Sequence, residues 1–189
     1  MRKLIYSMGV SLDGFIAGPD GEIDWSVPDE ELHRFHNEQA RAIGAHLYGR
    51  RLYETMKWWD AAEERPDAPG AIIEFARIWK ATPKVVFSRT LDAVEGTNTR
   101  LATGGAGEEV ARLKAQDGGA LSVGGAGLAA TLVELGHVDE FGLFVKPVIL
   151  GAGTPFFPPL DHRIELDLLE TRTFGSRVAY LRYAVRDGR

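Results

Sequence analysis

The chain has 189 residues, a formal net charge of −5 at pH 7, 44% hydrophobic residues and 26% charged residues. This balance is typical of one globular domain, and it argues against broad attraction to nucleic acid or to an anionic membrane surface. The absence of cysteine excludes disulfides, thiolate nucleophiles and zinc–thiolate or iron–sulfur sites. The first apolar run is too short for a signal peptide, and we expect a cytoplasmic protein.

Short apolar runs alternate with helix-like segments along the chain. Strands are predicted at 2–10, 45–49, 84–88, 97–102, 120–125 and 138–150, with a strand hairpin in 163–186 that turns near Gly175. Helices are predicted at 29–43, from 50, and at 71–81, 107–118 and 126–136, with a surface loop at 60–70. The alternation predicts an α/β fold with a mainly parallel central sheet, flanking helices and an antiparallel C-terminal hairpin.

The segment SLDGFIAGPDGEIDW (11–25) combines three glycines with large apolar side chains at Phe15, Ile16 and Trp25. A plain connector could be shorter and more polar, so the large apolar side chains need an explanation. One interpretation is a loop that packs on the protein's own core.

The segment LSVGGAGLAATL (121–132) runs from a strand through glycines into a helix. Glycines allow a ligand to approach the backbone, and the free N–H groups of a helix start bind phosphate. Residues 125–130 match G-x-G-x-x-A, but Asp139 and Glu140 follow too soon for the ribose-binding acid of a standard Rossmann site. A tight turn without a ligand is the alternative interpretation.

Two further strand ends carry anion-binding side chains. YGRR (48–51) places two arginines between a strand and a helix, and VFSRT (86–90) ends a strand with an arginine between hydroxyls. The carboxyl ends of parallel strands share one edge of a sheet, where ligands bind. The three segments together indicate a nucleotide with more than one phosphate site, although single arginines are commonly solvated surface residues.

These segments resemble the dihydrofolate reductase fold, in the branch shared with the C-terminal reductase domain of bifunctional riboflavin-biosynthesis enzymes. The resemblance is carried by SLDGFIA, GRRLYETM, VFSRT, SVGGAGLAATL and KPVILGAGTPFFP, in this order over nearly the whole chain. It implies one dihydrofolate-reductase-like domain over 1–189, a small-molecule substrate, NADPH as cofactor and a homodimer.

The resemblance also assigns cofactor-binding residues. It implies phosphate contacts from Gly49, Arg50 and Arg51, an adenosine 2′-phosphate site at Ser88, Arg89 and Thr90, and pyrophosphate amides at Ala126, Gly127 and Leu128. Gly124 and Gly125 match paired glycines that are often joined by a cis peptide in this fold. Leu52 departs from the family, because many relatives carry a threonine there that binds the pyrophosphate.

The resemblance extends to the substrate side. It implies that the loop 11–25 closes over the nicotinamide and the substrate and excludes water, with its glycines as hinges. Phe15, Ile16 and Ala17 match the loop limb that lies along the nicotinamide, and Trp25 matches a tryptophan near the second limb. Glu31 matches a helix carboxylate that binds and protonates the substrate, and Asp13 is a second candidate for the proton donor. The cluster DEE at 29–31 also has an ordinary interpretation as a helix-start charge cluster.

Other polar and aromatic residues receive plainer interpretations. His33 and His36 are spaced for metal ligation, but no further ligands stand out, so we expect a solvated helix face and no metal site. Trp58 and Trp59 are expected in the core or an interface. The aromatics of 151–159 are expected to line either the substrate pocket or a dimer contact.

The resemblance implies an NADPH-dependent reductase, similar to dihydrofolate reductase and 5-amino-6-(5-phosphoribosylamino)uracil reductase. Its substrate would be a small pterin- or pyrimidine-like heteroaromatic or a C=N or C=O compound. The zinc-binding motifs of the deaminase half are missing, which argues against the full bifunctional enzyme. Two alternatives stay open, namely a non-catalytic nucleotide-binding or regulatory module and an NADPH-independent flavin or pterin carrier.

Overall fold

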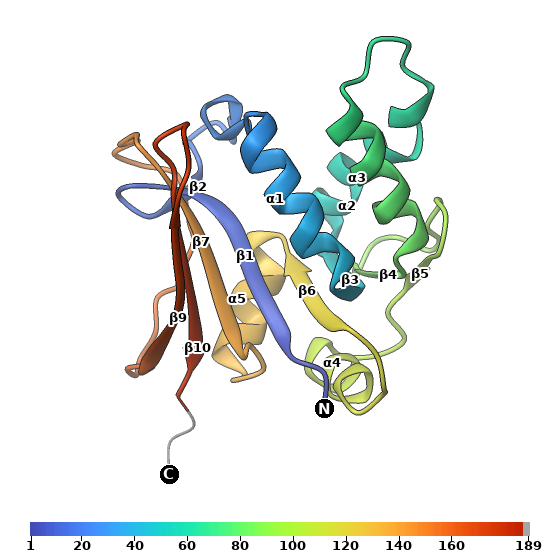
Figure 1. Ribbon diagram of the computed structural model, residues 1–189. Helices are drawn as coiled ribbons and strands as arrows, with labels where there is room; N and C mark the ends of the chain where they lie inside the picture. The colour runs from blue at the N-terminus through green and yellow to red at the C-terminus, as the bar shows by residue number, and fades with distance from the viewer. Residues whose placement is uncertain (187–189) are drawn as a thin grey trace.

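A computed structural model describes residues 1–186 and contains a twisted central sheet with helices on both faces (Figure 1). The sheet has eight strands in the order β5-β4-β3-β6-β1-β7-β10-β9. They are β1 (Leu4–Ser11), β3 (Ile43–Gly49), β4 (Lys84–Phe87), β5 (Thr99–Leu101), β6 (Ala120–Gly124), β7 (Glu140–Lys146), β9 (Leu166–Thr173) and β10 (Ala179–Val185). A separate two-stranded sheet joins β2 (Phe15–Ala17) to β8 (Thr154–Pro155).

Five α-helices and three short 3-10 helices connect the strands in the described part of the chain. They are α1 (Glu30–Arg41), α2 (Arg50–Met56), α3 (Gly70–Ala81), α4 (Ala106–Lys114), α5 (Ala126–Glu134), η1 (Asp24–Ser26), η2 (Lys57–Asp60) and η3 (Ala62–Glu64). Within residues 1–186, none of the helices has both the length and the apolar character needed to cross a bilayer.

The strand pairing confirms the predicted α/β class. β1 pairs in parallel with β6 and β7, β3 pairs in parallel with β4 and β6, and β4 pairs in parallel with β5. β10 pairs antiparallel with both β7 and β9, which is the predicted C-terminal hairpin. The carboxyl ends of the parallel strands therefore lie along one edge of the sheet.

Alternating side chains divide the core between the two faces of the sheet. Leu4 and Tyr6 of β1 pack with α4 and α5 on one face, where Val110 and Leu132 are fully buried. On the other face, Phe144 of β7 packs with Leu32 and Phe35 of α1 and with Tyr180 of β10. Figure 1 shows α1 lying across this second face beside α3.

The predicted helix at 29–43 is present as α1, two residues shorter at its C-terminal end because Ile43 already starts β3. The side chain of Asp29 caps the helix by accepting a hydrogen bond of 2.9 Å from Leu32 N. Its first turn contains two acidic residues and its last turn contains Arg41, which suits the helix dipole.

Several other predicted elements are shorter than expected, and two of them have a local reason. The helix predicted at 107–118 covers Ala106–Lys114, and the predicted range includes Gly118, whose φ of +136° lies outside the helical region. The strand predicted at 138–150 covers Glu140–Lys146, and it ends where Pro147 has no N–H to donate.

Candidate functional site

A cavity of about 420 Å³ lies between α1 and the sheet, and it extends along the strands from Ile43 at the start of β3 to Gly124 at the end of β6. Its floor is formed by β1, β3, β6, β7 and β10, and its walls by α1, α2, η2 and α3. The residues used below are Ser7, His33, His36, His46, Tyr48, Leu52, Trp59, Gly124 and Phe144. We call this cavity the cleft.

Three buried polar atoms of the cleft have no hydrogen-bond partner among residues 1–186. They are Ser7 Oγ, His33 Nδ1 and His46 Nε2. Because an unpaired buried donor or acceptor costs about 1–3 kcal/mol, such groups are usually satisfied by a ligand or by ordered water. The cleft therefore has the polarity of a binding site.

The cleft holds aromatic rings beside uncharged imidazoles. Burial lowers the pKa of His36 to about 4 and that of His46 to about 3, which makes both rings neutral at pH 7. The His36 ring lies 4.3 Å from the Phe144 ring, and His46 stacks on Tyr48 at 5.5 Å between ring centroids. These walls suit a flat heteroaromatic ligand.

The expectation of a solvated face for His33 and His36 was wrong, because both residues face the cleft. Their spacing of three residues puts them on one helix face with Gln39 and Ala40, which also line the cleft. That periodicity was the available signal. The residues described form no group of three potential metal ligands.

The three glycine- and arginine-bearing segments predicted to bind phosphate lie together, because β4, β3 and β6 are neighbours. Arg50 Nη1 donates a 2.8 Å hydrogen bond to Thr90 Oγ1, which joins the segments after β3 and β4. A Cβ on Gly125 would lie 3.5 Å from Gly49 N, and one on Gly49 would lie 3.7 Å from Leu128 Cβ. The backbone segments that follow β3 and β6 are therefore in contact at the sheet edge, next to the segment after β4, and we call the three segments together the cradle.

The start of α5 completes this cradle. Gly125 has a φ of +94°, which turns the chain from β6 into the helix. The N–H groups of Ala126, Gly127 and Leu128 precede the first hydrogen bond of this helix, from Ala129 N to Gly125 O. They are free for an anion, and a Cβ on Gly127 would meet no atom within 4 Å.

The expected cis peptide between Gly124 and Gly125 is absent, because the bond is trans. The positive φ of Gly125 makes the turn instead. Leu52 fills the space beside this peptide, since a Cβ on Gly124 would lie 2.3 Å from Leu52 Cδ2. Leu52 also lines the cleft, so an apolar side chain stands where many relatives carry a threonine.

The remaining predicted cofactor residues lie at the rim of the cradle. Arg51 and Arg89 are exposed. Ser88 shapes its turn by accepting hydrogen bonds from Thr90 N at 3.2 Å and Leu91 N at 3.1 Å. Arg89 therefore projects from a fixed turn at the end of β4.

The loop 11–25 is anchored at both limbs. Its first limb forms β2, which pairs with β8, and Ile16 is only 9% exposed within the core. Near its end, Ser26 Cβ lies 3.6 Å from the position of a Cβ on Gly9, on the α1 side of the sheet. The loop thus crosses the carboxyl end of β1, although Phe15, Ile16, Ala17 and Trp25 do not line the cleft. The first limb therefore packs on the protein's own core, which is the plainer interpretation of this loop.

Asp13 ties this loop to the segment after β7. Its carboxylate accepts hydrogen bonds from Ser11 Oγ at 2.7 Å, Leu150 N at 3.1 Å and Gly151 N at 2.7 Å. The hydrogen bond from Ser11, aided by those from the two amides, lowers the pKa of Asp13. These contacts favour a positioning role for Asp13 over proton donation.

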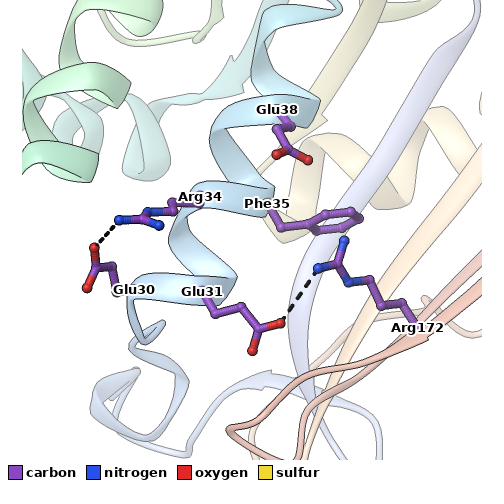
Figure 2. A pocket seen from close by; sticks show the side chains of 6 residues that line it. All are labelled: Glu30, Glu31, Arg34, Phe35, Glu38 and Arg172. Atoms are coloured by element: carbon purple, nitrogen blue, oxygen red, sulfur yellow. Dashed lines mark hydrogen bonds and ion pairs between the residues drawn. The ribbon is translucent and has the colours of Figure 1, made fainter.

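Glu31 lies outside the cleft. Figure 2 shows it in a charged groove of about 360 Å³ between α1 and β9, pointing toward Arg172. Its carboxylate accepts a 3.0 Å hydrogen bond from Gly175 N and lies 3.6 Å from Arg172 Nη2. The aromatic cluster of Phe35, Phe144 and Tyr180 stands between this groove and the cleft.

The other aromatic residues are distributed between core, surface and cleft. Phe156 is buried and stacks on Tyr6 at 4.3 Å, and Phe157 is 39% exposed beside Phe141. Neither lines the cleft. Trp58 is 44% exposed, whereas Trp59 lines the cleft.

The model of the RibD C-terminal domain family matches residues 2–180 of the chain. The chain belongs to this family. The match confirms the resemblance to the riboflavin-branch reductases and covers almost every element that builds the cleft and the cradle.

Sequence and structure comparisons agree with this assignment. The chain is 36% identical over 192 residues to the uncharacterized protein YyaP of Bacillus subtilis (strain 168), covering 96% of this chain and 94% of that protein. Its fold is similar to a putative riboflavin biosynthesis protein from Shewanella sp. PV-4, with TM-score 0.76, 21% identity and coverage of 98% and 99%. It is also similar to a dihydrofolate reductase from Enterococcus faecalis complexed with NADP(H), with TM-score 0.61, 15% identity and coverage of 98% and 97%. The fold is dihydrofolate-reductase-like.

Proposed function

We propose that the protein is an NADPH-dependent reductase that delivers a hydride to a small flat heteroaromatic or to a C=N or C=O compound. One observation carries the proposal: the cleft ends where the phosphate cradle begins. Tyr48 and Gly124 line the cleft, and the next residues, Gly49 and Gly125, form the cradle. A dinucleotide bound at the sheet edge would therefore extend its nicotinamide end into the cleft.

The residues of the cradle fit NADPH. Amides of Ala126, Gly127 and Leu128 would bind the pyrophosphate, with Gly49, Arg50 and Arg51 beside them. Ser88, Arg89 and Thr90 would bind the 2′-phosphate. Bound NADPH would supply the hydride, while the protein provides position and electrostatics.

The residues of the cleft would bind the substrate and exclude water. Ser7, His33 and His46 would offer hydrogen bonds to a polar ring edge, because Ser7 Oγ, His33 Nδ1 and His46 Nε2 have no partner among residues 1–186. Phe144 and Trp59 offer apolar contact to the ring faces. The loop 11–25 crosses the strand end beside this space, as expected of a lid.

The proposal is tested by hydride tracing. NADPH that carries deuterium at both C4 positions of the nicotinamide is incubated with the protein and a panel of pterins and aldehydes, whose reduction places the transferred deuterium on carbon. We expect oxidation of NADPH with at least one acceptor, and one deuterium in the reduced product. NADPH that binds without turnover on the whole panel would contradict a reductase.

A non-catalytic nucleotide-binding module is the second candidate. The position of the acidic residues favours this candidate, because a reductase of this kind would need a proton donor at the substrate. No Asp or Glu of residues 1–186 lines the cleft, and Glu31 lies in a separate groove. Under this candidate, NADPH would bind and remain unconsumed in the same experiment.

A further inference from the structure

Every buried charge in the described residues but one has a partner. The buried charged side chains are Arg2, Lys84, Glu109, Lys114, Glu140 and Lys146. Glu109 forms an ion pair with Arg100, and Glu140 forms ion pairs with Lys3 and Arg182. Lys84 Nζ donates to Trp79 O at 2.7 Å, Lys114 Nζ binds Asp139 at 2.6 Å, and Arg2 Nε donates to Gly119 O at 2.6 Å.

Lys146 is the exception. Its side chain is 5% exposed, and Nζ makes no hydrogen bond or ion pair with any of residues 1–186. The stem of this lysine is covered, but Nζ itself still reaches solvent, because it is not one of the fully buried side-chain atoms that lack a partner. Its N–H donors are therefore open to water or to a ligand.

Lys146 stands at the carboxyl end of β7, beside the cleft. It follows Phe144, a cleft residue, by two positions on the same face of the sheet. Its Cε lies 3.9 Å from the position of a Cβ on Gly9, and Ser26 Cβ lies 3.6 Å from the same position. Because Gly9 has no side chain, Lys146 lies close to the end of the loop that follows β1.

Two opposing effects act on the ammonium of Lys146. Burial lowers its pKa, and the charge of Asp29 opposes this effect. Asp29 itself caps α1 through Leu32 N and forms no ion pair with the lysine. The other cation at the cleft, Arg182, is held by Glu140 at 2.6 Å. Lys146 is thus the cation beside the cleft that is left for a ligand.

We infer that Lys146 is a substrate-binding residue whose ammonium donates to an oxygen of the substrate, either a ring carbonyl or a carboxylate. The inference rests on the proposed function and narrows its substrate class to heteroaromatics that carry an oxygen acceptor. The oxygen would lie at the end of the cleft next to Gly9 and Ser26, while the rest of the ring contacts Phe144 and His36.

The first test asks whether Nζ opens to the cleft. The wild-type protein is treated with pyridoxal and borohydride, and modified lysines are mapped by mass spectrometry. We expect Lys146 to react at least about ten times faster than Lys84 and Lys114, whose Nζ atoms are hydrogen-bonded. Exposed lysines that react while Lys146 stays unmodified would overturn the inference.

The second test measures binding without NADPH, so its result is independent of the cofactor. Two matched probes are titrated, 2-amino-4-oxopteridine and 2,4-diaminopteridine, which differ in an oxygen acceptor. We expect the wild type to prefer the oxo compound by about tenfold, Lys146→Met to lose this preference, and Lys146→Arg to keep most of it. A wild type without this preference, or a Lys146→Met variant that retains it, would contradict the inference.

The two experiments distinguish failure of the reductase proposal from failure of the Lys146 inference. A protein that does not bind NADPH but still prefers the oxo probe would reject the reductase and retain Lys146 as a ligand-binding residue. Thermal unfolding of each variant confirms that the fold is retained.

Discussion

His36 and His46 make the cleft polar without making it charged. His46 is 7% exposed on β3, and His36 contacts Phe144 from α1. Burial is the main cause of the low pKa of both residues, about 4 for His36 and about 3 for His46. A charged substrate ring would gain nothing from such walls, whereas a neutral ring can both stack and hydrogen-bond.

His36→Phe should weaken the decrease of the free energy of unfolding that accompanies a drop in pH on the acidic side of neutrality. The folded-state pKa of about 4 lies below the ordinary value of 6.5, so the unfolded chain binds more protons between these pH values. Stability must therefore fall as the pH drops through this window, by up to about 1.4 kcal/mol per pH unit for one histidine. Urea denaturation from about pH 7 to about pH 4.5 measures this slope.

Exposed His162 provides the control for this prediction. The His162→Gln variant should keep the wild-type slope, because its side chain remains largely in solvent. A slope in His36→Phe equal to that of the wild type would show that His36 is not held neutral by burial.

At the scale of elements, the start of α5 is the part of the cradle with the clearest geometry. The helix has nine residues, and its first three amides have no acceptor within the helix. Gly127 faces open space with an ordinary helical backbone. A side chain can be added there without disturbing the packing of the helix on the sheet.

Gly127→Glu should weaken NADPH binding by at least about tenfold, because it places a carboxylate where the pyrophosphate would bind. Gly127→Ala fits the same space without a charge, so it should change affinity by less than about twofold, and it should stabilise the helix by about 0.5–1 kcal/mol. Isothermal titration with NADPH compares both variants with the wild type. Equal affinity in the Glu variant would exclude this helix start from the cofactor site.

At the scale of the whole molecule, the sheet edge at β9 offers an apolar surface for the expected homodimer. β9 is the last strand of the sheet, and Leu168 and Leu169 on it are 55% and 50% exposed. The register between β9 and β10 is irregular here, since Tyr183 pairs with Leu168 and Arg182 with Glu170. Apolar side chains on an open edge favour association with a second sheet.

The double substitution Leu168→Lys and Leu169→Lys should therefore convert a dimer into a monomer, because it places charge on the edge. Sedimentation equilibrium measures the mass of both proteins, with exposed Leu135→Lys as the control at the end of α5. A monomeric wild type, or a dimer that survives the double substitution, would contradict an interface at β9.

The sequence predicted most of the architecture but only part of the site. Strand and helix periodicities were sufficient for the α/β class, and glycines at strand ends predicted which segments meet at the sheet edge. The histidines of α1 were missed because polar residues at helical spacing were interpreted as a solvated face, although the same spacing places them on one face with Ala40, which lines the cleft. Glu31 and Lys146 depend on long-range packing: Phe35 separates the first from the cleft, and Gly9 brings the backbone of β1 close to the second.

The most direct test of the account is a titration of NADPH and NADH against tryptophan fluorescence, because Trp59 lines the cleft and Trp25 lies in the crossing loop. We predict tighter binding of NADPH by about tenfold or more, loss of this preference in Arg89→Ala, and no change in Arg163→Ala. Arg163 serves as the control because it lies near the start of β9, at the opposite edge of the sheet. Failure of the wild type to bind either nucleotide would contradict the account.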